Sequence, residues 1–172
     1  MLDITKLLQS SISFDLQMTE QKDILLGPEA RQINAMTTLD IELGKLYQLS
    51  HWNEVWHDQE TENLTELTRQ FVRVIFWLLL FSAQKQWTHL VVMTPADYEH
   101  IKQLPPQSKV ADQDKLYLSI KNFLYGAYFE HRQADFKHAW HLLLKLGLVD
   151  LKLDDQKIMT SFAEWQAALL KK

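Results

Sequence analysis

The chain has 172 residues, no cysteine and a formal net charge of −4. This length fits one domain over residues 1–172, and the lack of cysteine excludes disulfide bonds and thiolate chemistry. Acidic residues are scattered among the basic ones, so no basic face is expected to bind nucleic acid. The longest apolar run, Val74 to Phe81, is too short to cross a membrane. We therefore expect a cytoplasmic protein that contacts neither nucleic acid nor membrane.

The spacing of the apolar residues predicts an all-α fold, a helical bundle. Glycine and proline number only four each, and apolar residues recur at helical spacing in long segments. A first helix is expected over about 2–19. Pro28, at a first helical position, begins a second helix that runs to about Ser50.

The central element is the helix predicted over 66–86, which Asn63 caps. Apolar residues surround it almost completely, so it belongs in the middle of the bundle. One stripe of this helix is polar, with Gln70 and Arg73 in line with Trp77 and Leu80. The residues before it, 58–63, form an acidic segment that we expect to be a solvated loop.

Four further helices are predicted after the central helix. The β-branched run 88–93 is not expected to form a strand, because one isolated strand has no partner. Helices are then predicted from Thr94-Pro95 to the Pro105-Pro106 pair, over 114–132, from a cap at Asp135 to Gly147, and over 155–170 with Asp154 as cap.

Glu42 is the most unusual residue of the second helix. It lies between Leu39 and Leu46 on the apolar side, with Lys45 one turn later. A carboxylate in such surroundings needs a partner. The alternative to a buried, paired carboxylate is an ordinary exposed ion pair between Glu42 and Lys45. For Gln70 and Arg73, the alternative to burial is a solvated strip on the central helix.

Three segments of the chain together resemble the dimeric dUTPases, a branch of the all-α NTP pyrophosphatase superfamily. The opening segment 2–8 (LDITKLL) is similar to the first helix of that family. Segment 39–46 (LDIELGKL), followed by Trp56, resembles its second-helix motif. Leu146-Gly147, with Ile158 and Phe162 downstream, resembles the run into its last helix.

The resemblance implies a helical homodimer that hydrolyses dUTP to dUMP and pyrophosphate with Mg²⁺. Such a metal is held by Glu-x-x-Glu on one helix and Glu-x-x-Asp on the next, which project oxygen ligands from one face of each helix. The first pair falls here on Glu42 and Lys45, and the second on Gln70 and Arg73. We call these four residues the vestigial site, because Glu42 is the only acidic ligand position retained. No metal cofactor is expected there, and Lys45 and Arg73 are expected to pair with Glu42 and Asp40.

Other positions of the family also differ in this chain. The family's histidine on the central helix corresponds to Phe76, and its phosphate-holding string on the last helix corresponds to 165–169 (WQAAL). Trp52 and Trp56 resemble the aromatic segment near the family's base pocket. They are candidates for substrate binding, with core packing as the alternative.

The expected function is that of a dUTPase-like protein without Mg²⁺-dependent hydrolysis, retained as a binding or regulatory protein for a nucleotide or a protein partner. One alternative is an active dUTP or NTP pyrophosphatase, which would use Mg²⁺ and a relocated acidic cluster of Asp40, Glu42 and loop 58–62. Another is a helical dimer whose sole role is to bind a protein.

Overall fold

The computed structural model describes residues 1–56 and 63–171, and these residues form α-helices and no β-strand. The α-helices are α1 (Ile4–Gln21), α2 (Pro28–Leu49), α3 (Leu64–Gln84), α4 (Pro95–Lys102), α5 (Val110–Phe129), α6 (Gln133–Lys145) and α7 (Asp155–Leu170). A 3₁₀ helix (Thr88–Leu90) lies between α3 and α4, and a π-helical turn (Leu146–Asp150) follows α6. The all-α prediction is confirmed, and the segment 88–93 is not a strand.

Several helices begin where the local sequence predicts. Pro28 is the first residue of α2, where its missing N–H costs nothing. The Asn63 side chain accepts hydrogen bonds from the first-turn amides of α3, and Asp154 does the same for α7. Thr94 and Asp97 form a reciprocal capping box at the start of α4.

The two predictions at the ends of α6 are wrong. This helix begins at Gln133, and Asp135 lies in its first turn, where it accepts a hydrogen bond from Arg132 Nε at 2.6 Å. At the other end, α6 stops at Lys145, before Gly147, and the backbone continues as the π-helical turn over Leu146–Asp150. A Cβ atom on Gly147 would lie 2.1 Å from Phe71 Cζ, so this glycine lets α3 approach closely and does not serve as a left-handed cap.

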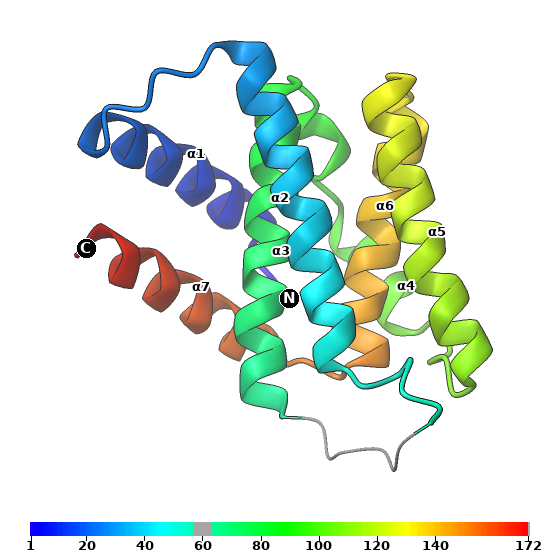
Figure 1. Cartoon of the computed structure of the whole chain (residues 1–172). Helices are drawn as coiled ribbons and strands as arrows, with labels where there is room; N and C mark the ends of the chain where they lie inside the picture. Colours follow the sequence, from blue (N-terminus) through cyan, green and yellow to red (C-terminus); the bar gives the residue numbers. More distant parts are fainter. Residues whose placement is uncertain (57–62, 172) are drawn as a thin grey trace.

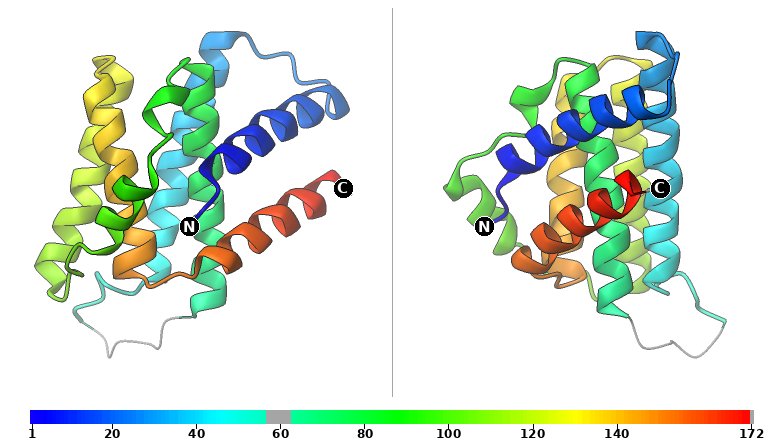
Figure 2. Two further views of the ribbon diagram at one scale, coloured as in Figure 1. Left: turned by 180° about the vertical axis from the view of Figure 1, so that it is seen from behind. Right: turned by 90° about the vertical axis from the view of Figure 1, so that its left-hand side faces the viewer.

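Helix α3 is the centre of the bundle, as its apolar surface predicts. It packs against α2 along most of its length and against α1 and α7 on another side (Figure 1). Figure 2 shows α1 and α7 crossing the α2–α3 pair obliquely, while α5 and α6 pack together on the opposite side. None of the helices in the described residues is long and apolar enough to span a membrane.

A buried ion pair closes the turn after α6. Lys145 Nζ lies 2.9 Å from both carboxylate oxygens of Asp150, whose side chain is 0% exposed. The backbone N–H of Gln107 also donates to Asp150, at 2.7 Å. The pair therefore ties the turn to the segment between α4 and α5.

Candidate functional site

The vestigial site lies where α2 and α3 face each other. Leu39, Leu43 and Leu46 point into the core and hold α2 against α3. Glu42 lies on the edge of this apolar stripe and is only 8% exposed. The helix register therefore buries a carboxylate against α3, as the apolar flanks of Glu42 predict.

Two side chains donate hydrogen bonds to the Glu42 carboxylate, one to each oxygen. Lys45 Nζ donates to Oε1 at 2.8 Å, from one turn further along α2. Gln70 Nε2, from α3, donates to Oε2 at 2.6 Å and also to the backbone carbonyl of Glu42 at 2.9 Å. Gln70 is itself buried, so its amide links the two helices inside the bundle.

These contacts set the ionisation of Glu42. Burial alone raises the pKa of a carboxyl group, because it disfavours the charged form. The hydrogen bonds from Lys45 and Gln70, together with the positive charges of Lys45 and Arg73, outweigh burial and hold the pKa of Glu42 below its usual value. The carboxylate is therefore charged at neutral pH and compensated within the protein.

Arg73 does not pair with Glu42, which corrects the sequence-based expectation. It is half-buried, and its Nε atom is buried without a hydrogen-bond partner among residues 1–56 and 63–171. Gln70, which precedes it by one turn on α3, occupies the oxygen of Glu42 that faces α3. The guanidinium of Arg73 acts on Glu42 through charge alone.

Asp40 belongs to a different face of α2. Its carboxylate lies 2.9 Å from Lys121 Nζ and accepts a hydrogen bond from the Tyr125 hydroxyl at 2.7 Å, both on α5. A separation of two residues corresponds to a rotation of roughly 200° around the helix axis, so Asp40 and Glu42 point to nearly opposite sides of α2. The structure does not bring these two carboxylates together, and the loop residues Asp58, Glu60 and Glu62 lie outside the described residues.

The vestigial site does not fit Mg²⁺. A magnesium ion needs free oxygen ligands, but both oxygens of Glu42 already accept hydrogen bonds from cationic or amide nitrogens. The neighbouring ligand positions hold Lys45 and Arg73, whose charge opposes that of the ion. Elsewhere in the described residues, no group of three His, Asp or Glu side chains is arranged to hold a metal.

The two candidate tryptophans lie in different environments. Trp52 is buried and packs edge-to-face on Tyr47, with ring centroids 6.0 Å apart, so it belongs to the core. Trp56 is 90% exposed, at the end of the described part of this segment. This difference in burial does not support a shared aromatic surface for a base.

Phe76 and Gln166, the positions that the resemblance would assign to a histidine and to phosphate-holding residues, make structural contacts instead. The Phe76 ring packs edge-to-face on Phe14 and Trp165, with centroids 5.6 and 4.9 Å away. The Gln166 side chain bonds to Ser10 through its carbonyl oxygen, at 2.6 Å, and thereby connects α7 to α1. These positions pack helices together.

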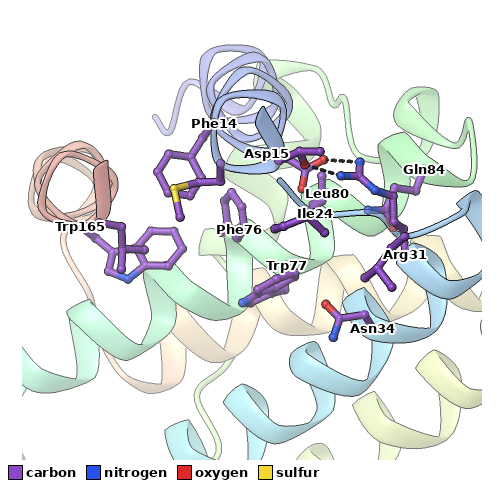
Figure 3. Close-up of a pocket in the computed structure, with 14 residues that line it drawn as sticks. Phe14, Asp15, Ile24, Arg31, Asn34, Phe76, Trp77, Leu80, Gln84 and Trp165 are labelled. Carbon is purple, nitrogen blue, oxygen red and sulfur yellow. Dashed lines mark hydrogen bonds and ion pairs between the residues drawn. The ribbon is translucent and has the colours of Figure 1, made fainter. Parts of the chain in front are cut away.

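A cavity of about 220 Å³ lies between α1, α2, α3 and α7 (Figure 3), and its lining on α3 begins at Phe76, one turn after Arg73. We call it the α1–α7 cavity. Its aromatic wall consists of Phe14, Phe76, Trp77 and Trp165. Trp77 and Leu80, which continue the polar stripe of α3, both line this cavity. No sequence pattern links Phe14 with Trp165, because they come from opposite ends of the chain.

Comparisons of this chain with models of known families, with characterised proteins and with solved structures find no significant match.

Proposed function

We propose that this chain is a dUTPase-like helical-bundle protein that does not hydrolyse nucleoside triphosphates and serves as a binding or regulatory protein. The main support is that both carboxylate oxygens of Glu42 are occupied, by Lys45 and by Gln70. A position that holds a metal ligand in the family is used here to join α2 to α3.

The charge at the vestigial site supports the same proposal. The four positions hold one acid, one amide and two cations, in place of the four acids of the family. At an effective dielectric constant of about 20, two unit charges about 4 Å apart interact by about 4 kcal/mol. The positive charges of Lys45 and Arg73 oppose the entry of a divalent cation, and by less than this where solvent screens them.

The active-enzyme alternative lacks comparable support. It would use a cluster of Asp40, Glu42 and loop 58–62. Asp40 bonds to α5 and Glu42 to α3, and the loop lies outside the described residues. We therefore retain hydrolysis only as an outcome that would refute the proposal.

A hydrolysis assay tests the proposal directly. The protein is incubated with dUTP and other nucleoside triphosphates, with Mg²⁺ or Mn²⁺, and pyrophosphate release is measured. We expect no turnover above the rate without protein. Turnover of about 1 per second or more, within the usual range of enzymes, would contradict the proposal.

Restoring the acidic ligands provides a second test. In the triple variant Lys45→Glu, Gln70→Glu and Arg73→Asp, Mg²⁺ affinity measured by calorimetry should rise, although the phosphate-holding residues are still absent. The control Lys109→Glu, Lys115→Glu and Gln133→Glu makes the same change in net charge at exposed positions. An equal rise in both variants would show that net charge alone attracts the ion.

A homodimer in the cytoplasm is part of this proposal. Helices α2 and α5 expose several large apolar side chains, namely Ile33, Ile41, Leu118, Tyr125 and Phe129. Burying such side chains against a second copy would remove them from water. Sedimentation equilibrium tests the homodimer, and cell fractionation tests the cytoplasmic location.

A further inference from the structure

The α1–α7 cavity is a second feature of the molecule that could bind a ligand, and the vestigial site does not explain it. Helices α1 and α7 lie on one side of it, and α2 and α3 on the other (Figure 3). Apolar cavities of roughly 150 Å³ hold a benzene molecule. The larger volume here, about 220 Å³, accommodates an aromatic ring with a short chain.

The charged groups of the cavity neutralise each other. Asp15 Oδ2 lies 3.2 Å from Arg31 Nη1, and Arg31 also donates to the Thr19 hydroxyl. Burial is the largest influence on Asp15 and raises the pKa of its carboxyl group. An ionic ligand would therefore meet neither an unpaired charge of opposite sign nor a strongly polar wall.

Gln84 offers a hydrogen bond that the protein does not use. Its Oε1 atom is buried and has no hydrogen-bond partner among the described residues, while its backbone carbonyl accepts from Gln32 Nε2 at 3.1 Å. A buried acceptor without a partner is costly. Protein atoms cover Oε1 almost completely, so a donor brought by a ligand would satisfy it once the Gln84 side chain turns toward the cavity. Gln84 and Trp77, two turns apart on α3, both line the cavity, about 10 Å apart along the helix axis.

We propose that the α1–α7 cavity binds a neutral, elongated small molecule, with an aromatic ring packed against Trp77, Phe14 and Trp165 and one hydrogen-bond donor at the other end for Gln84 Oε1. The aromatic wall favours edge-to-face packing of such a ring. A ligand with several polar edges would leave most of them unpaired against Leu80, Ile24 and Leu26. This inference rests on the proposed function in that it names what the binding protein holds, but a separate measurement tests it.

The test uses three probes of matched size, measured by calorimetry on the full chain. They are 3-phenylpropan-1-ol, which has a donor, butylbenzene, which has none, and 3-phenylpropionitrile, which has only an acceptor. Each is titrated into the natural protein and into Gln84→Met, a variant that removes the amide and keeps the length of the side chain. Gln86→Met, at an exposed position, is the control.

Gln84→Met should weaken binding of the alcohol about five- to tenfold, as expected for the loss of one hydrogen bond. Butylbenzene and the nitrile should bind Gln84→Met at least as tightly as the natural protein. If the nitrile is weakened as much as the alcohol, the amide donates to the ligand, and the proposed donor requirement is overturned. If none of the probes binds, the cavity is not a site of this class.

A second pair of variants locates the probes. Leu169→Trp fills the cavity and should abolish binding of all bound probes, whereas Leu170→Trp, at the next position and outside the lining, should not. Circular dichroism checks that both variants are folded. Equal binding to the two variants, or displacement of the alcohol by dUMP, would overturn the proposal. Neither result depends on whether the protein hydrolyses dUTP.

Discussion

The carboxylates of Glu42 and Asp150 both lie inside the bundle, and the protein compensates them in different ways. The Asp150 side chain is 0% exposed and binds Lys145, whose side chain is 8% exposed, so both charged groups are removed from water. Glu42 is buried too, but its cation Lys45 has a side chain that is 51% exposed, and its second partner is the neutral Gln70. This difference indicates that the first pair is wholly internal, while the second reaches the protein surface through Lys45.

Breaking the buried pair should have the greatest effect on stability. Lys145→Met leaves Asp150 charged and without its cation, and should destabilise the protein by about 3–5 kcal/mol. Urea unfolding followed by circular dichroism measures the loss. The double variant Lys145→Met with Asp150→Leu should recover part of it. A single-variant loss below about 1 kcal/mol would remove the contrast between the two carboxylates.

A smaller effect is expected for the amide that joins α3 to Glu42. Gln70→Met removes the donor at 2.6 Å from Glu42 Oε2 and leaves that oxygen buried, so it should cost about 1–3 kcal/mol. The same urea experiment measures it, with the exposed residue Gln48 changed to Met as the control. Equal stability of the two variants would mean that water replaces the amide at Glu42.

Arg73 should matter less than Gln70, although it carries a charge. Arg73→Ala removes a half-buried guanidinium whose Nε has no hydrogen-bond partner in the described part of the chain, so a loss of about 1 kcal/mol or less is expected. Urea unfolding measures this loss, and Arg69→Ala, at an exposed position on the same helix, is the matched control. A loss of about 3 kcal/mol or more for Arg73→Ala would restore the mutual pairing that the sequence predicted.

The dependence of stability on pH through Glu42 should be the weakest of these effects. The pKa of Glu42 is lowered on folding, so its contribution is present above the unfolded value of 4.5 and is lost as pH falls through the folded value. Between about pH 7 and about pH 3, the natural protein should therefore lose more stability than Glu42→Gln. Parallel losses in the two proteins, measured by urea unfolding at each pH, would show that Glu42 is not compensated by its neighbours.

Local sequence signals predicted much of the fold for a simple physical reason. The cap at Asp154, the proline at the start of α2 and the apolar surface of α3 act within a few residues, so their effects can be read without knowing the rest of the chain. The prediction for Gly147 failed because its role is contact with Phe71, which lies on a distant helix.

At the candidate site, too, local contacts were predictable from the sequence and contacts between helices were not. The apolar flanks of Glu42 predicted its burial and its need for a partner, and the spacing to Lys45 predicted one contact correctly. The choice of Gln70 over Arg73 as the second partner was not predictable, because it depends on the register between α2 and α3. Side-chain reach across two packed helices decides such contacts.

An all-α bundle with α3 at its centre follows from the order of the residues alone, because helical periodicity and capping are local properties of the chain. The folded arrangement was needed to find that Gln70 joins Lys45 on Glu42 and that Asp40 bonds to α5. It was also needed to find that residues from both ends of the chain enclose a cavity. These contacts depend on distances between helices that lie far apart in the sequence, and the packing of the whole core sets those distances.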